Sequence, residues 1–186
     1  MRIGPRAKLM LIAALFLVPV AASLFAYRFL RPEPTANYGE LLLPPDTLAD
    51  TTLAREDGRT FRFSEMSGRW ILVASDSGAC RAQCAAKVHA MRQVRLALGR
   101  NASRVARVFV VDDLAAPDPA AFAPLEDLVI AITPRGLLLP PGASNDRAHI
   151  YLVDPRGNVM MRWPANPQFR GMLKDLERLL KASQIG

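Results

Sequence analysis

An uncharged apolar run near the N-terminus constrains this chain more than any other feature of its sequence. Residues 9–27 form 19 consecutive positions without a charged side chain. A helix of that length crosses about 30 Å, the hydrocarbon thickness of a bilayer. A single segment inside a bilayer must satisfy its own backbone hydrogen bonds, which a helix does. We therefore expect residues 1–30 to form a short stub and one transmembrane anchor.

The charges around the apolar run indicate its orientation. Three basic residues precede the run, two follow it, and residues 1–32 contain no acid. This bias favours a cytoplasmic N-terminus. The alternative is a cleaved signal peptide with Val20-Ala21-Ala22 as its cleavage site, but the apolar run continues beyond that point. Both interpretations export the following domain, and we expect a single-pass protein of the bacterial inner membrane with its domain in the periplasm.

The net charge of +7 is concentrated beside the expected anchor. Five basic residues lie within residues 1–32, whereas residues 33–186 carry 19 basic and 17 acidic residues. Basic groups next to a membrane span attract anionic head groups, so a membrane is the expected partner. No basic stripe interleaved with aromatic residues occurs in the rest of the chain, and the sequence does not favour nucleic-acid binding.

Residues 31–40 are rich in proline and polar groups and are expected to form a short tether. Residues 41–186 have the usual length of one domain. Apolar runs and the turn signals Asp57-Gly58 and Asp154-Pro155-Arg156-Gly157 predict its elements. In chain order these are a hairpin at 53–63, a strand at 70–75, a helix ending before Gly99, strands at 105–111 and 128–132, a hairpin at 149–162 and a helix at 169–180. This order predicts an α/β domain of thioredoxin-like arrangement.

The only two cysteines, Cys80 and Cys84, lie where the first core strand meets its helix. A spacing of four residues places two side chains on one face of a helix, with Cα atoms about 6 Å apart, which a disulfide can span. A helix N-terminus and Arg81 favour the thiolate form of Cys80. Such a pair can exchange disulfides or hold a soft ion such as Cu(I). A structural disulfide or two buried thiols are the alternatives.

From residue 41 to residue 180 the sequence resembles the Sco/SenC family of membrane-anchored, thioredoxin-fold proteins, as a divergent member. The matching segments are Leu42-Leu43-Pro44-Pro45, Asp57-Gly58-Arg59-Thr60-Phe61, Phe63-Ser64-Glu65-Met66-Ser67-Gly68-Arg69-Trp70, the Cys80/Cys84 pair, Tyr151-Leu152-Val153-Asp154-Pro155-Arg156-Gly157 and Leu173-Lys174-Asp175-Leu176. The resemblance implies a role in cytochrome c oxidase assembly, with oxidase subunits or other assembly factors as partners. It also implies a cysteine pair that acts with a distant histidine on copper, or alone as a thiol reductant.

The sequence departs from this family at positions that decide the chemistry. Ala85 follows the second cysteine where the family has proline, and Asp146 stands at the position of the metal-binding histidine. The candidate third copper ligand beside Cys80 and Cys84 is then His149 or Asp146 itself, and the alternative role of His149 is structural. We expect a thiol–disulfide oxidoreductase that uses Cys80 and Cys84, with a copper metallochaperone or a non-catalytic assembly scaffold as alternatives. Copper is the one cofactor that the residues suggest.

Overall fold

A computed structural model describes residues 4–29, 37–48, 50, 52–122, 127–133, 138–139, 143–144 and 146–183. The chain divides into two units, Met1–Ala36 and Asn37–Gly186. Residues 31–36 of the expected tether lie outside the described residues.

The described part of the first unit, residues 4–29, contains one helix, α1 (Pro5–Phe29), which includes the whole apolar run. Its 25 residues give a length of about 37 Å. Of the helices in the described residues, it is the one long and apolar enough to cross a membrane, over Pro5–Ala26. The expected N-terminal helix is therefore confirmed. The candidate cleavage site at Val20-Ala21-Ala22 lies inside it.

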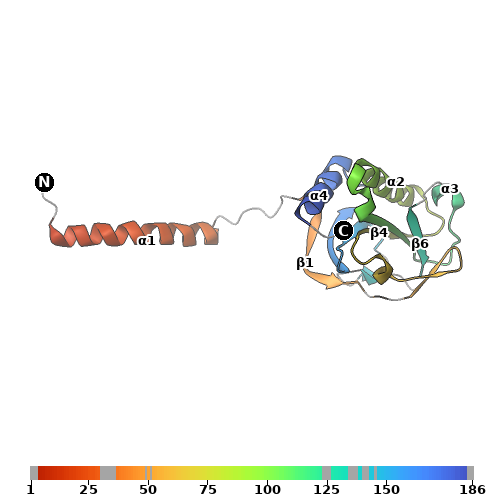
Figure 1. Ribbon diagram of the computed structural model, residues 1–186, viewed down its shortest axis with the longest axis horizontal. Helices are drawn as coiled ribbons and strands as arrows, with labels where there is room; N and C mark the ends of the chain where they lie inside the picture. The colour runs from red at the N-terminus through yellow and green to blue at the C-terminus, as the bar shows by residue number, and fades with distance from the viewer. Residues whose placement is uncertain are drawn as a thin grey trace. The chain divides into compact units, whose positions relative to one another are not determined.

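The second unit is built on a mixed sheet with helices on one face (Figure 1). Within the described residues the strand order is β1-β10-β9-β4-β5-β6-β2-β3, and β7 pairs separately with β8. Its elements are β1 (Glu40–Thr47), β2 (Leu53–Arg55), β3 (Thr60–Phe61), η1 (Phe63–Met66), β4 (Trp70–Asp76), α2 (Ala82–Ala97), η2 (Gly99–Arg104), β5 (Val105–Val111), α3 (Pro119–Phe122), β6 (Leu128–Ile132), β7 (Leu138–Leu139), β8 (Ala143–Ser144), β9 (His149–Val153), β10 (Asn158–Pro164) and α4 (Phe169–Ala182).

Two hydrophobic clusters, one on each face of the sheet, form the core. The central strands β4 and β5 run parallel and are buried along almost their whole length, as their continuous apolar sequences predict. Helices α2 and α4 pack on one face with Leu72, Ile150 and Trp163. The other face buries Val73, Tyr151 and their neighbours. Alternate residues of one strand therefore belong to different faces, which matters for the site described below.

Both predicted hairpins are confirmed. β2 pairs with β3 in antiparallel register, Leu53 opposite Phe61, and Gly58 in the turn has φ +78°, a conformation that glycine adopts without strain. β9 pairs with β10 around the Asp154–Gly157 turn. The edge strand β1 was not expected from the sequence, because Pro44 and Pro45 lie within it. An edge strand tolerates proline since one side of it needs no ladder hydrogen bond.

The segment 37–39 is fastened to α4 by one buried carboxylate. Asp175 is 1 % exposed and accepts hydrogen bonds from the backbone N–H of Tyr38 at 3.0 Å and of Gly39 at 2.7 Å. It also accepts the indole N–H of Trp163 at 3.0 Å. The hydroxyl of Tyr38 in turn accepts the backbone N–H of Gln168 at 2.9 Å. The start of the second unit is thus part of its packed structure.

Candidate functional site

The two cysteines form a disulfide at the C-terminal end of β4. Cys80 closes the turn that follows the strand, Cys84 lies in the first turn of α2, and their Cα atoms are 5.0 Å apart. Cys80 is 7 % exposed and Cys84 is 1 % exposed. The structure therefore brings together the two residues that the sequence singled out, at the strand-to-helix junction where they were expected.

The backbone at Cys80 differs from the sequence-based expectation. Both cysteines were expected on one helical face, but α2 begins at Ala82, and Cys80 precedes it with φ +37°. A residue with a Cβ adopts this left-handed conformation at a cost of about 1–2 kcal/mol. Non-glycine residues held in this way concentrate at functional sites. Cys80 thus approaches Cys84 from a turn rather than along a helix face.

The turn before Cys80 is packed against the loop that follows β5. Gly78 donates its backbone N–H to Oδ1 of Asp113 at 3.1 Å, and its carbonyl accepts the N–H of Asp118 at 2.9 Å. A Cβ atom on Gly78 would lie 2.1 Å from the carbonyl oxygen of Ala115. Only glycine allows this approach. Residues 113–118 therefore hold the cysteine-bearing turn in place.

A buried lysine lies on α2, three residues after Cys84. Lys87 is 0 % exposed, and its Nζ forms an ion pair with Asp76 at 2.7 Å. It also donates to the carbonyl oxygens of Ser75 at 2.6 Å and Arg147 at 2.8 Å. Burial lowers the pKa of Lys87, and the hydrogen bond and charge of Asp76 act in the opposite direction. One ammonium group thus joins α2, the end of β4 and the segment before β9.

Arg147 extends this ion cluster to the loop after β5. Its guanidinium binds the carboxylate of Asp112 and lies 3.4 Å from Asp113 and 3.8 Å from Asp76. Hydrogen bonds from Ser77, Gly78 and Ala115 and the charge of Arg147 hold the pKa of Asp113 below its usual value, although burial opposes them. The carboxylate of Asp113, beside the cysteine turn, is therefore held in the charged form by these contacts.

His149 lies on the sheet face opposite to the cysteines. Its neighbour Ile150 packs with Cys84 in the α2 cluster, so strand alternation directs residues 149 and 151 to the other face. There the ring of His149 packs edge-on against Tyr151, with centroids 6.1 Å apart. Its Nδ1 lies 2.6 Å from Oδ2 of Asp146. The structure pairs His149 with Asp146 and does not bring it to Cys80 and Cys84.

Asp146 is the centre of this second polar group. It binds the hydroxyl of Tyr151 and accepts the backbone N–H of Ala148 at 2.8 Å. Burial alone would raise the pKa of Asp146, but the hydrogen bonds from Tyr151, His149 and Ala148 together lower it. Burial and the same contact with Asp146 raise the pKa of Tyr151.

The lowered pKa of Asp146 predicts a pH dependence of stability. Its contribution is fully present above the pKa of an unfolded aspartate, about 3.9, and is lost as the pH falls through the lower folded value. We expect Asp146→Asn to make the free energy of unfolding less dependent on pH below about pH 4. Urea unfolding of both proteins at neutral pH and in acid measures the difference. Parallel pH profiles for the two proteins would contradict this assignment.

Three further side chains with soft or imidazole donor atoms, His89, Met160 and Met161, do not join either group. His89 is exposed on α2. Met161 is buried in the core and Met160 is partly buried against it. Among the described residues, no cluster of three or more His, Cys, Asp or Glu side chains is arranged to hold a metal ion.

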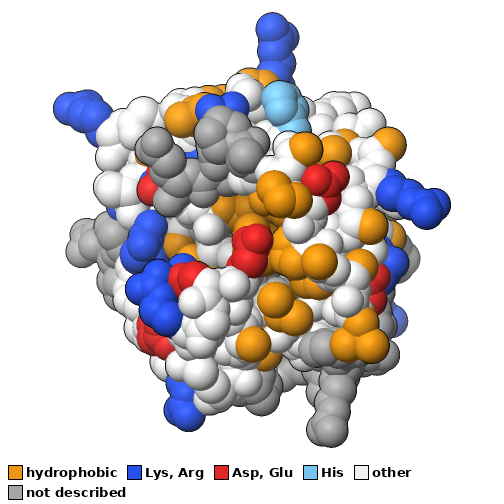
Figure 2. All heavy atoms as spheres, turned by 90° about the vertical axis from the view of Figure 1, so that its right-hand side faces the viewer, with side chains coloured by type: hydrophobic (Ala, Val, Ile, Leu, Met, Phe, Trp, Pro, Cys, Tyr) orange, Lys and Arg blue, Asp and Glu red, His pale blue; other side chains and the backbone are white. Residues whose placement is uncertain are grey.

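The surface on the α3 side of the domain is apolar near its centre. Figure 2 shows hydrophobic side chains gathered there around acidic groups, with Lys and Arg mainly at the rim. Leu114, in the loop that packs against Gly78, is 89 % exposed. The loop beside the cysteine turn thus presents an apolar group to solvent.

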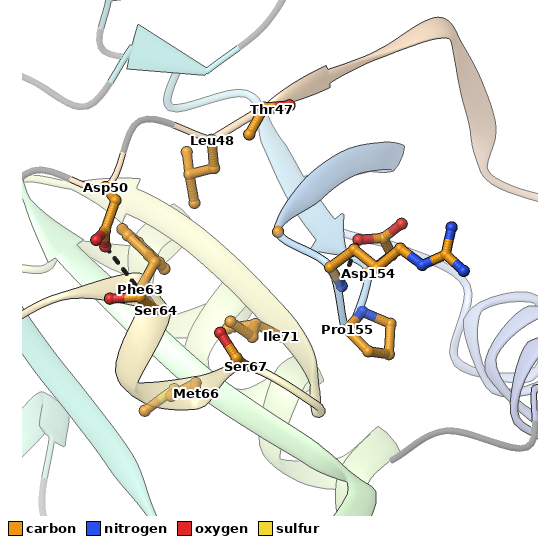
Figure 3. Close-up of a pocket in the computed structure, with 12 residues that line it drawn as sticks. Thr47, Leu48, Asp50, Phe63, Ser64, Met66, Ser67, Ile71, Asp154 and Pro155 are labelled. Atoms are coloured by element: carbon orange, nitrogen blue, oxygen red, sulfur yellow. Dashed lines mark hydrogen bonds between the residues drawn. The ribbon is translucent and has the colours of Figure 1, made fainter.

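A cavity of about 150 Å³ lies at the opposite end of β4 (Figure 3). Its lining includes Phe63, Ile71 and the Asp154–Gly157 turn, and Asp50 accepts the N–H of Ser64 at 3.1 Å beside it. Ile71 is near the start of β4 and Cys80 follows its end, and the seven residues of the strand place its two ends about 20 Å apart. The cavity is therefore separate from the cysteine site.

Lys87 is one of the site residues that the local sequence pattern did not predict. A single lysine among the alanines of early α2 is normally expected on the solvent-exposed face. The one signal of its burial in the sequence was its position three residues after Cys84, which places it on the buried side of the helix.

Comparison with known proteins places this geometry in a family. A family model described as a transmembrane-like, thioredoxin-like, C-terminal domain matches residues 70–183, more than half of the chain. No curated protein matches the sequence.

Many solved structures share the fold. The apo Sco1 protein from Thermus thermophilus is 18 % identical, with 79 % of this chain and 99 % of that chain covered and a TM-score of 0.61. BsSco, a Sco-family cytochrome c oxidase assembly protein with a disulfide switch, is 15 % identical over 77 % and 99 %, with a TM-score of 0.57. Copper-bound ScoI from Arabidopsis thaliana is 13 % identical over 74 % and 100 %, with a TM-score of 0.55. The chain thus belongs to the transmembrane-like, thioredoxin-like family, and its domain has the fold of Sco proteins.

Proposed function

We propose that this chain is a membrane-anchored, Sco-like accessory protein for cytochrome c oxidase maturation that acts by thiol–disulfide exchange through Cys80 and Cys84. The observation that carries the proposal is the disulfide between them, closed by a turn in which Cys80 has φ +37°. The Sco fold supports the assignment, since BsSco carries a disulfide switch and belongs to an oxidase assembly family.

The proposal includes the organisation and location of the chain. Residues 1–30 form a cytoplasmic stub and the anchor, 31–40 the tether, and 41–186 the active domain. The domain then lies in the periplasm of a bacterium, where disulfides persist. The apolar length of α1 supports the anchor.

The exchange step follows from the positions of the two sulfur atoms. In the reduced protein, the thiolate of Cys80 attacks a disulfide of the partner and forms a mixed disulfide, with one partner thiolate leaving. The thiolate of Cys84 then attacks Sγ of Cys80 and releases the second partner thiol. Two electrons pass to the partner, and the disulfide seen here is the oxidised product. Cys80 is the attacking residue because it is the more exposed of the pair.

Replacement of the cysteines tests the proposal. We expect Cys80→Ser to abolish exchange, and Cys84→Ser to trap the mixed disulfide, because each step needs its own thiolate. The measurement is the reduction of a disulfide-bonded oxidase-subunit peptide by the pre-reduced full chain. In a deletion strain, both variants should fail to restore oxidase activity. Ser103→Ala, at an exposed serine away from the cysteine turn, is the control and should retain both activities.

Two results would contradict thiol exchange. The first is a disulfide that resists mild dithiol reductants, which indicates a structural bond. The second is full restoration of oxidase activity by the double Cys→Ser variant, which indicates a scaffold that needs no thiol chemistry.

Copper delivery by the same pair is the second candidate function. Once reduced, two cysteines whose Cα atoms are 5.0 Å apart provide the two thiolates that Cu(I) accepts. His149 would become a third ligand only after leaving Asp146 for the other face of the sheet. Anaerobic Cu(I) titration of the reduced chain separates the functions: stoichiometric binding that Cys80→Ser abolishes and His149→Ala leaves unchanged indicates a two-thiolate copper site.

A further inference from the structure

The outer face of α4 carries a row of basic side chains. Arg170, Lys174, Arg178 and Lys181 follow one another at intervals of three or four residues, which places them on one side of a helix. All four are exposed, and Glu177 is the one acid among the exposed residues of the helix. The opposite side packs into the core through Met172, Asp175, Leu176 and Leu180.

This row accounts for most of the net charge of the second unit. Helix α4 holds four basic and two acidic residues, and the rest of Asn37–Gly186 holds 15 basic and 14 acidic residues. One of the two acids, Asp175, is buried and turned away from the surface. Most of the excess positive charge of the second unit is therefore displayed on one helix face.

Exposed apolar side chains flank the basic row. Phe169, at the start of α4, is 45 % exposed, and Tyr38 and Leu41 are each 38 % exposed. Tyr38 lies beside the helix, since its hydroxyl accepts the N–H of Gln168 and a Cβ atom on Gly171 would lie 2.5 Å from its ring. Figure 1 shows α4 and β1 on the same side of the domain. Aromatic groups beside basic residues are typical of surfaces that bind at a membrane interface.

The number of residues between Phe29 and Asn37 limits how far this face can lie from the expected anchor. Arg178 donates to Oδ1 of Asn37 at 3.2 Å, so the basic row adjoins the first residue of the second unit. Seven residues separate Phe29 from Asn37 and can span at most about 28 Å. A domain held at this distance meets the lipid surface at high local concentration.

We propose that the outer face of α4, with Phe169, Tyr38 and Leu41, docks on the anionic head groups of the bilayer that holds α1. This inference rests on the membrane anchoring included in the proposed function. None of the residues of the cysteine turn or of the 113–118 loop belongs to the docking face. The docked domain therefore leaves the disulfide open to a partner.

The lysines of the chain provide the test. Lys174 and Lys181 lie on the docking face, and Lys87 is buried and reports correct folding. The full chain is placed in nanodiscs of phosphatidylcholine, alone or mixed with phosphatidylglycerol, and acetylated with a water-soluble amine reagent under single-hit conditions. We expect acetylation of Lys174 and Lys181 to slow at least about fivefold in the anionic discs, since one basic residue near an anionic surface changes binding by about that factor. Protection should disappear in about 1 M salt, where the Debye length is about 3 Å.

A matched pair of variants distinguishes the effect of this face from the effect of the total charge. Arg170→Gln/Arg178→Gln removes two charges from α4 and keeps both reporter lysines, whereas Arg100→Gln/Arg156→Gln removes two exposed charges elsewhere. We expect the first variant to lose the protection and the second to keep it. Phe169→Ser should weaken the protection without changing the net charge.

Each outcome is decisive. Equal acetylation in both discs, or equal effects of the two double variants, would show a merely solvated helix face and overturn the docking. Insertion is measured first, as resistance of the chain to alkaline extraction from vesicles. An extractable chain contradicts the anchor, whereas an inserted chain with reactive lysines contradicts the docking alone.

Discussion

Asp175→Ala is expected to lower the free energy of unfolding by about 3–5 kcal/mol. The carboxylate accepts three N–H groups, from Tyr38, Gly39 and Trp163, and is 1 % exposed. Alanine leaves these donors without an acceptor in the core, at about 1–3 kcal/mol each when buried. Urea unfolding of the full chain in detergent, followed by the near-ultraviolet signal of the tryptophans, measures the loss.

Two companion variants define the cause of the loss. Glu177→Ala removes an exposed carboxylate from the same helix and should change stability by no more than about 0.5 kcal/mol. Asp175→Asn keeps the shape of the side chain but turns an amide N–H toward one of the donors. Its loss of stability should lie between the losses for Asp175→Ala and Glu177→Ala. If Asp175→Ala is as mild as Glu177→Ala, the carboxylate does not hold the 37–39 segment.

Lys87→Met is expected to cost about 3–5 kcal/mol, because it leaves the Asp76 carboxylate without its closest cation. It also removes the donor to the carbonyl oxygens of Ser75 and Arg147. Methionine fits the volume of the lysine stem, so the loss reports the ammonium group rather than a cavity. Chemical denaturation measures it, and Lys174→Met, at an exposed lysine, is the control.

A double-mutant cycle with Asp76→Asn isolates the ion pair. The double variant should be more stable than the sum of the single losses predicts, with a coupling energy of about 1–3 kcal/mol. Strict additivity would mean that Lys87 acts through its two carbonyl contacts alone. The same cycle, repeated with the rate of disulfide reduction as readout, shows whether the pair also positions Cys80.

Local sequence patterns predicted most of the fold. The apolar runs of β4 and β5 are long enough to be buried strands. Asp57-Gly58 marks the β2–β3 hairpin, and the Asp154–Gly157 turn marks the β9–β10 hairpin. The strand β1 was missed because its prolines conceal an edge position that depends on pairing with β10. Its assignment needs a long-range partner, which local propensity does not contain.

Of the candidate site, the cysteine pair was predicted from the sequence. The arrangement of the residues around the pair was not. The spacing of Cys80 and Cys84 indicated a pair, but the left-handed turn at Cys80 depends on Gly78 and the distant Ala115. The burial of Lys87 likewise depends on Arg147, 60 residues away. Strand alternation assigns His149 to the face of Tyr151, and only the packing of Ile150 shows that this face is not the one with the cysteines.

The attachment of segment 37–39 to α4 determines where mechanical force enters the domain. Tension along the chain from α1 reaches Asn37 first and is then borne by the hydrogen bonds to Asp175 and Gln168. The hydrogen bonds between β1 and β10 bear this force only after these bonds break. Strands β10 and β9 lie between β1 and β4 in the sheet, so a force on segment 37–39 must cross two strands before it reaches the strand that ends at the disulfide.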